Sequence, residues 1–426
     1  MDIAKIILFV SLSAQIFVEV GAEENEVFEN FNGFVEIRLG ELNQADPNQN
    51  DQSIGEARLQ LETEKEFDQF TFNFVTDIIY DPVLDEYATD LVTGEGTIDL
   101  RQTNIVFSPL DSMDVKLGRQ ILTWGTGDLL FINDLFAKDW NSFLIGRDDE
   151  YLKAPTDAVK FSVFFDAINM DLVYTPKFSA DRFIDGKRIS FFDRTTNSFR
   201  GRDNPLVVNR PDDTFKDDES AVRFYRSFGI YETALYYYNG FWKSPAGQDP
   251  VTGNTIFPDL QVFGVSLRGP IAKGIAHVEA GYYKSSAQAA SDSLSRNSEY
   301  RFLAGYEQEL ATELTGAIQY YVERKLDYDT YINSLPTSAV QDDEYRRVIT
   351  LRLAKLLMQQ KLKLSFFNFH SPSDKDGYVR LQISYKMSDR FKIETGLNHF
   401  YGDQPHTFYS QFENSSNIYF ATRYEF

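Results

Sequence analysis

The sequence predicts a transmembrane antiparallel up-and-down β-barrel of about 18 strands, with 16 strands as the alternative. Many segments alternate apolar and polar residues with a period of two, which places one kind of side chain on each face of a strand. These segments are ~9–11 residues long, the length with which a tilted strand crosses a bilayer. The connections between them are short and long in turn, as in outer-membrane barrels.

The first 22 residues, MDIAKIILFVSLSAQIFVEVGA, have the pattern of a secretory signal peptide. Lys5 supplies the positive charge, residues 6–20 the apolar run, and Val20-Gly21-Ala22 the small residues of a cleavage site. A buried N-terminal helix is the alternative, and the polar residues EENE that follow at once argue against it. We therefore expect residues 23–426 to form a single exported barrel domain, which is built without disulfides because the chain has no cysteine.

The C-terminal end shows the alternation clearly. In IYFATRYEF, Ile418, Phe420 and Tyr424 lie on one face of the predicted strand, while Arg423 and Glu425 lie on the other. The same pattern predicts strands at residues 31–39, 54–64, 68–78, 97–108, 113–122, 157–166, 168–175, 219–228, 231–240, 259–268, 274–284, 298–307, 313–324, 345–356, 360–368, 376–387, 391–400 and 417–426. After the signal peptide, no segment approaches the ~18 apolar residues that a membrane-spanning helix needs.

The lengths of the connections distinguish a membrane barrel from a soluble β-sandwich. Short turns such as EFD, SPLDS, GPIAK and MSDR alternate with long loops, among which residues 123–156 and 176–218 are the longest. A soluble sandwich has the same period of two but no reason for one set of loops to be long. An even number of strands places both termini on the short-turn side, which is periplasmic in the bacterial outer membrane. The terminal aromatic residue Phe426 is typical of proteins of that membrane.

With the apolar faces outward, the polar faces line a relatively basic lumen. One cluster lies on three neighbouring predicted strands and consists of Lys361, Lys363, Arg380, Lys386 and Lys392. Because charged rings set the selectivity of such pores, this cluster indicates a preference for anions. The alternative is a lattice of compensating ion pairs that fills the wall. The whole chain is acidic, with 42 basic and 64 acidic residues, and this argues against general nucleic-acid binding.

Residues 123–156 form a loop that is too apolar to lie in water, so we expect it to fold into the barrel and to pack on the wall. Asp128, Asp134 and Arg147 would then lie at a constriction of the lumen. Packing of this loop over the rim or against a partner subunit is the alternative.

The loop 176–218 is the second candidate for an inward-folded loop, and it interleaves arginines with phenylalanines. Guanidinium groups bind carboxylate or phosphate with two prongs, so Arg188, Arg194, Arg200 and Arg202 are candidate contacts to an anionic saccharide or an aromatic acid. The alternative is a surface loop of mixed charge, because acidic residues occur in the same span.

Arg119 stands on the apolar face of its predicted strand, where a cation at mid-bilayer costs ~2–4 kcal/mol. We expect Gly118 to form a bulge that turns Arg119 into the lumen. The alternative is a shorter crossing, in which Arg119 extends to the outer interface.

The residues around Arg119, LGRQILTWGTGD, resemble the Gly-Arg-Gln and Trp-Gly signature of a family of porin-like barrels of the Gram-negative outer membrane. The matching positions are Gly118, Arg119, Gln120, Trp124 and Gly125. The predicted architecture is also similar to the alginate-export type of 18-stranded barrel, whose lumen is rich in arginine. The resemblance implies a passive conduit with inward-folded loops and does not name a solute.

These observations predict an outer-membrane channel for small, anionic solutes or saccharides. A non-conducting structural or complex-forming barrel and an export conduit with a periplasmic partner are the alternatives, and a hydrolase at the outer rim is less favoured. The sequence contains no known catalytic motif, and no two of its four histidines have the spacing of metal ligands on one strand face. We therefore expect that the protein is not an enzyme and that it binds no cofactor or metal. The expected partners are membrane lipid, lipopolysaccharide and the solute. The sequence leaves open whether the chain forms a homo-oligomer or binds another envelope protein.

Overall fold

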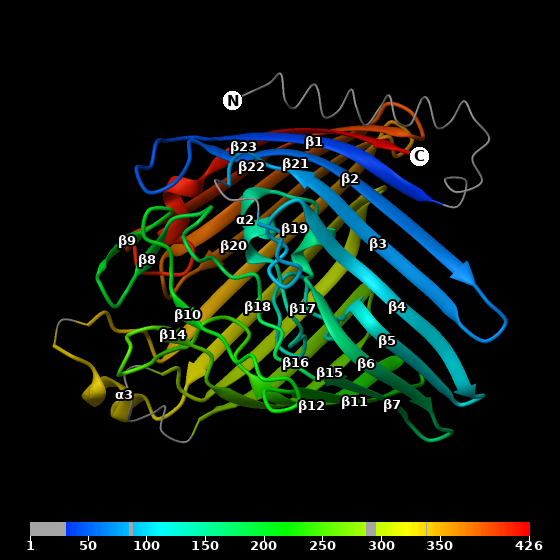
Figure 1. Ribbon diagram of the computed structural model, residues 1–426, viewed down its shortest axis with the longest axis horizontal. Helices are drawn as coiled ribbons and strands as arrows, with labels where there is room; N and C mark the ends of the chain where they lie inside the picture. The colour runs from blue at the N-terminus through cyan, green and yellow to red at the C-terminus, as the bar shows by residue number, and fades with distance from the viewer. Residues whose placement is uncertain (1–30, 85–87, 287–294, 338) are drawn as a thin grey trace.

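The computed structural model describes residues 31–84, 88–286, 295–337 and 339–426, and its strands form a closed antiparallel ring (Figure 1). The signal-peptide prediction lies outside the described residues. Closure is made by β1, which pairs with β2 on one side and with β23 on the other. The 18 strands of the ring are β1 (Asn32–Leu42), β2 (Gln52–Glu66), β3 (Thr71–Tyr80), β4 (Ile98–Leu110), β5 (Met113–Ile121), β6 (Pro155–Phe164), β7 (Asn169–Thr175), β11 (Glu219–Phe228), β12 (Tyr231–Phe241), β15 (Asp259–Ile271), β16 (Gly274–Ser285), β17 (Glu299–Ala311), β18 (Leu314–Lys325), β19 (Tyr345–Leu357), β20 (Leu362–Ser371), β21 (Asp376–Lys386), β22 (Phe391–Gly402) and β23 (Asn417–Glu425).

Every predicted strand has its counterpart in this ring, so the prediction of an 18-stranded barrel is confirmed. The boundaries differ by up to a few residues at strand ends. One such difference concerns a residue that was predicted to line the lumen. Strand β20 begins at Leu362, so Lys361 lies in the preceding turn.

The two ends of the barrel are unlike. At the short-turn end, β1 begins beside the last residues of β23, with Phe34 opposite Glu425. The long-loop end carries the remaining described elements, apart from those inside the barrel. The short elements between ring strands are α2 (Trp140–Ile145), η1 (Asp149–Leu152), β8 (Phe191–Asp193), β9 (Ser198–Arg200), β10 (Val208–Asn209), β13 (Gly247–Gln248), β14 (Thr255–Ile256), α3 (Tyr328–Ser334) and η3 (Ser410–Ser415).

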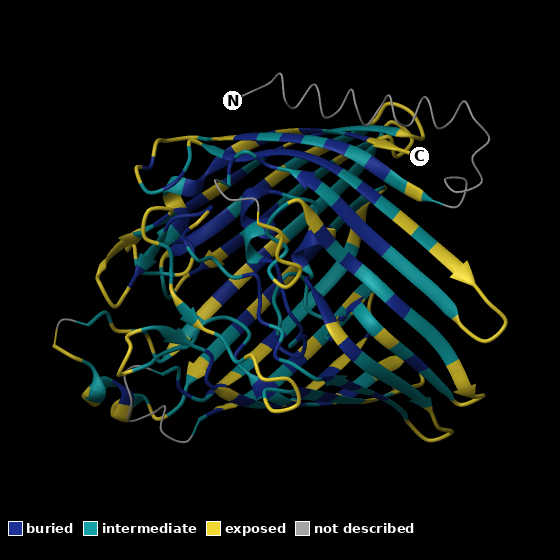
Figure 2. Ribbon diagram, in the orientation of Figure 1, coloured by how far each residue is buried: buried dark blue, intermediate teal, exposed yellow. Residues whose placement is uncertain are grey.

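The strands have one exposed apolar face and one covered inner face, as β18 shows. Ile318 and Tyr320 point outward and are 53% and 41% exposed, whereas Gln319 and Tyr321 point inward and are buried. This alternation gives the striped strands of Figure 2 and is the arrangement that membrane barrels have. Among the described residues, no helix is long and apolar enough to cross a membrane.

Candidate functional site

The segment between β5 and β6, residues 122–154, lies inside the barrel, and we call it the inserted segment. Figure 1 shows its helix α2 between the barrel walls. Its contacts follow the inner wall around the ring: Trp124 packs against β12, Asp128 bonds to β18, and Gly146 bonds to β1. The inserted segment therefore contacts opposite sides of the barrel before the chain returns to β6.

One side of the inserted segment packs on an aromatic wall. The Phe143 ring makes edge-on contacts with Phe369 of β20 and Tyr378 of β21, with centroids 6.1 and 5.6 Å apart. Ile132 and Ile145 are fully buried in the same cluster. Full burial of a large apolar side chain stabilises by ~1.5–3 kcal/mol, so these residues hold the segment in the lumen rather than above it.

Helix α2 owes its bounds to its two caps. The Asp139 carboxylate accepts a hydrogen bond from the Ser142 N–H at 2.8 Å, as an N-cap residue does. The helix ends at Gly146, whose φ of +86° disfavours other residues. A Cβ at Gly146 would also lie 2.6 Å from side-chain atoms of Asn398 and Tyr419, so the chain passes close to the wall only because this residue is glycine.

The carboxylate of Glu279, on β16, anchors the first part of the inserted segment. It accepts hydrogen bonds from the backbone N–H groups of Thr126, Gly127 and Asn133, and from the Thr126 hydroxyl and the Asn133 amide. Glu279 is almost completely buried. A buried carboxylate with several donors is strongly held, because each donor would otherwise lack a partner.

Replacing Glu279 with alanine is expected to lower the free energy of unfolding by ~3–5 kcal/mol, because buried donors of the inserted segment lose their acceptor. Hydrogen exchange of residues 126–133 should accelerate in the same variant. Glu279→Gln retains one acceptor oxygen and should lose less stability. Equal stability of Glu279→Ala and the wild type in urea unfolding would contradict this role.

The other side of the inserted segment docks on a charged wall made by β22, β23 and β1 to β4. Arg38 is fully buried and bonds to Glu36 at 3.0 Å, to Glu394 at 2.9 Å and to the Gly146 carbonyl at 2.8 Å. Arg423 adds a second ion pair to Glu36 at 2.9 Å. These charges are paired with one another, so this wall matches the ion-pair lattice that was the alternative for inward charges.

The three constriction residues predicted in the inserted segment each bind a partner. Asp128 pairs with Arg352 of β19 at 2.6 Å, and burial raises the pKa of Asp128 above its ordinary value while Arg352 opposes that rise. Asp134 pairs with Lys138 at 2.9 Å. Arg147 pairs with Glu56 of β2 at 2.5 Å. The pairs made by Asp128 and Arg147 join the inserted segment to the barrel wall, whereas the pair of Asp134 with Lys138 lies within the segment.

Four of the five predicted lumen cations lie on β20 to β22 and divide into two groups, and the fifth, Lys361, lies outside these strands. Arg380 pairs with Asp149 at 2.5 Å, and Lys392 lies 3.7 Å from Asp148, so both contact the inserted segment. Lys363 and Lys386 are exposed near the short-turn end, and the described residues offer neither of them an ion-pair partner. Lys361 was expected on the inner wall, but it lies in the turn before β20 because the strand begins one residue later.

Two further lysines face the lumen on the other side of the ring. Lys116 of β5 and Lys160 of β6 lie directly opposite each other across the strand pair. Lys160 is 3.8 Å from Asp171, and Lys116 has no ion-pair partner among the described residues. Like charges in such a position destabilise a sheet. The alternation of apolar and polar residues predicts both lysines on the inner face, but they were not among the residues predicted to set the selectivity.

The arginines of loop 176–218 do not gather into one ligand site. Arg188 is buried, donates to the Ser53 carbonyl at 3.0 Å and pairs with Asp81. Arg194 pairs with Asp342 from the loop before β19.

The other two arginines of this loop have partners close in sequence. Arg200 pairs with Asp193 across the β8–β9 hairpin. Arg202 lies 3.8 Å from Asp203 and is partly exposed. Arg188 and Arg194 therefore tie loops together at the long-loop end, whereas Arg200 and Arg202 have local partners. The role of the four arginines as ligand contacts stays a prediction.

Arg119 does not turn into the lumen, and the prediction of an inward bulge was wrong. Gly118 has a φ of +119°, yet Arg119 stays in register opposite Asp157. The guanidinium group makes two bonds to Asp157, at 2.8 and 2.7 Å, and one to the Leu91 carbonyl at 2.6 Å. Because β5 ends at Ile121, this outward ion pair lies near the long-loop end, where a charge is tolerated.

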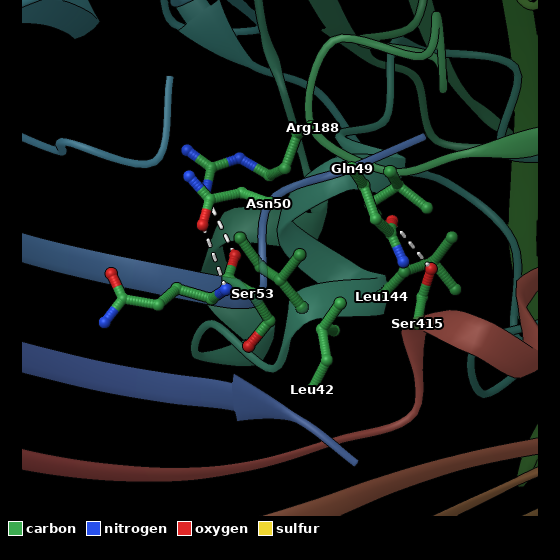
Figure 3. Close-up of a pocket in the computed structure, with 10 residues that line it drawn as sticks. Leu42, Gln49, Asn50, Ser53, Leu144, Arg188 and Ser415 are labelled. Atoms are coloured by element: carbon green, nitrogen blue, oxygen red, sulfur yellow. Dashed lines mark hydrogen bonds between the residues drawn. The ribbon is translucent and has the colours of Figure 1, made fainter. Parts of the chain in front are cut away.

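A small cavity lies where α2 meets Arg188 and the connection between β1 and β2 (Figure 3). Its volume is about 10 Å³, which is room for at most one water molecule. The Ser53 hydroxyl beside it is buried without a hydrogen-bond partner. The cavity is therefore a packing detail of the inserted segment and is far smaller than a solute site.

Fold and inserted segment together define a barrel of the porin type. A similar solved structure is OccD3 (OpdP) of Pseudomonas aeruginosa, at 8% identity and a TM-score of 0.52 over 93% of this chain and 91% of that one. Another is OmpF of Salmonella typhi in complex with daunomycin, at 11% identity and a TM-score of 0.43 over 93% of this chain and 97% of that one. A third is an OmpT loop-deletion mutant of Vibrio cholerae, at 11% identity and a TM-score of 0.42 over 93% of this chain and 98% of that one.

The likeness to OccD3 shows that this chain has a porin-like β-barrel fold. No family model matches the sequence, and no curated protein matches it. The resemblance of residues 117–128 to a family signature therefore stays an expectation.

Proposed function

We propose that this chain is a channel of the bacterial outer membrane that passes small anionic solutes or saccharides, with both termini on the periplasmic side. The observation that carries this proposal is a pair of basic surfaces in the short-turn half of the lumen. Lys116 and Lys160 form one of them, and Lys363 and Lys386 form the other, about half way around the ring.

Three of these lysines, Lys116, Lys363 and Lys386, have no ion-pair partner among the described residues, and this supports a role for them in the passage of anions. Deeper charges such as Arg38 and Arg380 are neutralised by carboxylates, whereas Lys363 and Lys386 are exposed and without an ion-pair partner among the described residues. Exposed charges of one sign on facing walls raise the local concentration of ions of opposite sign. The inserted segment supplies the narrowing without which a barrel of this size would not discriminate.

A non-conducting structural barrel is the second candidate. The observation that favours it is the inserted segment itself, which is bonded to β16 by Glu279 and to β1 by Arg38, on different sides of the lumen. Such anchoring suits a permanent plug as well as a fixed constriction. Single-channel recording separates the two, because a plugged barrel shows no discrete current steps.

Exchanging Lys116, Lys363 and Lys386 for glutamate is expected to change the sign of the reversal potential in a salt gradient, because the facing surfaces then attract cations. Lys216→Glu is the matched control, since Lys216 is an exposed lysine of the loop 176–218. Its selectivity should equal that of the wild type. Unchanged selectivity of the triple variant would show that these lysines take no part in ion passage.

A further inference from the structure

The outer face of the barrel carries a group of cations and tyrosines at the long-loop end of β16 to β22. We call this group the rim patch. It consists of Lys284, Arg324, Arg347, His370, His399, Tyr282, Tyr300, Tyr345 and Tyr401.

The cations of the rim patch point away from the lumen. Arg324 alternates with the outward Ile318 and Tyr320 of β18, and its side chain is 48% exposed. Arg347 alternates with Ile349 of β19, which is also outward and exposed. These guanidinium groups therefore face the surroundings of the barrel and take no part in the lumen.

The members of the rim patch contact one another across neighbouring strands. The guanidinium carbons of Arg324 and Arg347 lie 5.5 and 5.8 Å from the centroid of the same Tyr345 ring. Further along, the His370 Nδ1 lies 3.1 Å from the Tyr401 hydroxyl. The two arginines on one ring form a compact pair of donors, which suits a group that carries more than one negative charge.

Little of this positive charge is neutralised by the protein. Arg324 pairs with Glu344 at 3.0 Å, and Asp343 stands beside Glu344 in the sequence where β19 begins. Within the described part of the chain, Arg347 and Lys284 have no ion-pair partner. An exposed pair such as Arg324 with Glu344 is weak and can exchange for a better acceptor.

On the opposite half of the outer rim, around β5 to β7, polar side chains are bound by carboxylates of the protein. There the guanidinium of Arg119 is taken up by Asp157, and Tyr174 donates to Asp218 at 2.8 Å. Asp259, at the start of the adjacent strand β15, is an exposed acidic residue at the edge of the rim patch beside β16. The basic surface is thus confined to one side of the barrel and is no general belt.

Exposed apolar residues continue from the rim patch toward the middle of the same strands. Phe302, Ile318, Leu351 and Ile383 are 43%, 53%, 38% and 47% exposed on the outer face. A ligand with phosphates at one end and acyl chains at the other matches this sequence of charged, aromatic and aliphatic surface, since tyrosines lie at headgroup level in membranes.

We propose that the rim patch is a binding site for the phosphorylated headgroup of lipopolysaccharide in the outer leaflet, with Arg324 and Arg347 as its main phosphate contacts. The inference rests on the proposed location in the outer membrane with the long loops outward. It does not depend on whether the lumen conducts.

The test is native mass spectrometry of the detergent-solubilised barrel titrated with bisphosphorylated lipid A. Removal of one cation beside an anionic lipid surface weakens binding by about fivefold, so Arg324→Gln with Arg347→Gln should weaken it by about 25-fold. The matched control is Lys65→Gln with Arg226→Gln, because Lys65 and Arg226 also lie over aromatic rings, those of Phe67 and Phe228, at the other end of the barrel. The control should bind lipid A as the wild type does.

The proposal would be overturned by wild-type affinity in the Arg324/Arg347 variant, by equal binding of dephosphorylated lipid A, or by displacement of lipid A by inorganic phosphate at equal concentration. Loss of binding in the control variant would also overturn it. Circular dichroism establishes that each variant is folded. Conductance of the same samples is read separately, because an inactive channel contradicts the proposed function and leaves the lipid result standing.

Discussion

Replacing residues 129–144 with a short Gly/Ser linker should raise the single-channel conductance several-fold. This change removes helix α2 and the contact of Phe143 with Phe369 and Tyr378, which holds the segment against the aromatic wall. A Gly/Ser linker is a flexible coil without apolar side chains, so it has no reason to stay on the wall. Planar-bilayer recording measures the effect.

The matched control replaces residues 249–253, a turn at the long-loop end with its own hydrogen bonds, by the same kind of linker. Its conductance should equal that of the wild type, because this turn belongs to a hairpin between β13 and β14. An unchanged conductance in the 129–144 variant would mean that the inserted segment does not limit the current.

Replacing Arg38 with alanine is expected to lower the free energy of unfolding by ~3–5 kcal/mol, because removal of one partner leaves buried charge uncompensated. The Glu36 and Glu394 carboxylates lose their shared cation, and the Gly146 carbonyl loses a donor. The urea concentration at half-unfolding in lipid vesicles measures the loss.

Lys216→Ala is the comparison for Arg38→Ala. Lys216 pairs with Asp213 in an exposed loop, and an exposed ion pair contributes about 0–1 kcal/mol. A similar small loss in both variants would mean that water reaches the Arg38 network and screens it. A larger loss in Arg38→Ala agrees with a wall that is dry where the inserted segment docks.

The strands themselves were predictable, because each of them has an apolar face toward the outside of the barrel and a polar face toward its inside. The alternation of Ile418, Phe420 and Tyr424 with Arg423 and Glu425 needs no knowledge of the neighbouring strands, since a strand turns its side chains to opposite faces by geometry alone. The apolar composition of residues 123–156 likewise indicated that these residues would avoid water.

The contacts of the candidate site were less predictable. The alternation shows on which face of a strand a side chain lies, but it does not show which residue that side chain contacts. Arg380 and Lys363 share the inner face, yet Arg380 is paired by Asp149 of the inserted segment while Lys363 stays exposed. Arg119 shows the same limit, because the outward carboxylate of Asp157 on the next strand accommodates the charge without a bulge.

The sequence by itself determined a barrel of about 18 strands, the orientation of their two faces and the presence of an apolar segment in one long connection. These features depend on residue type and on a period of two, which are local properties. Only the tertiary structure decided that Glu279 and Arg38 anchor that segment at different walls, and which lysines have an ion-pair partner among the described residues. Such pairings join residues more than a hundred positions apart, so they exist only once the ring has closed.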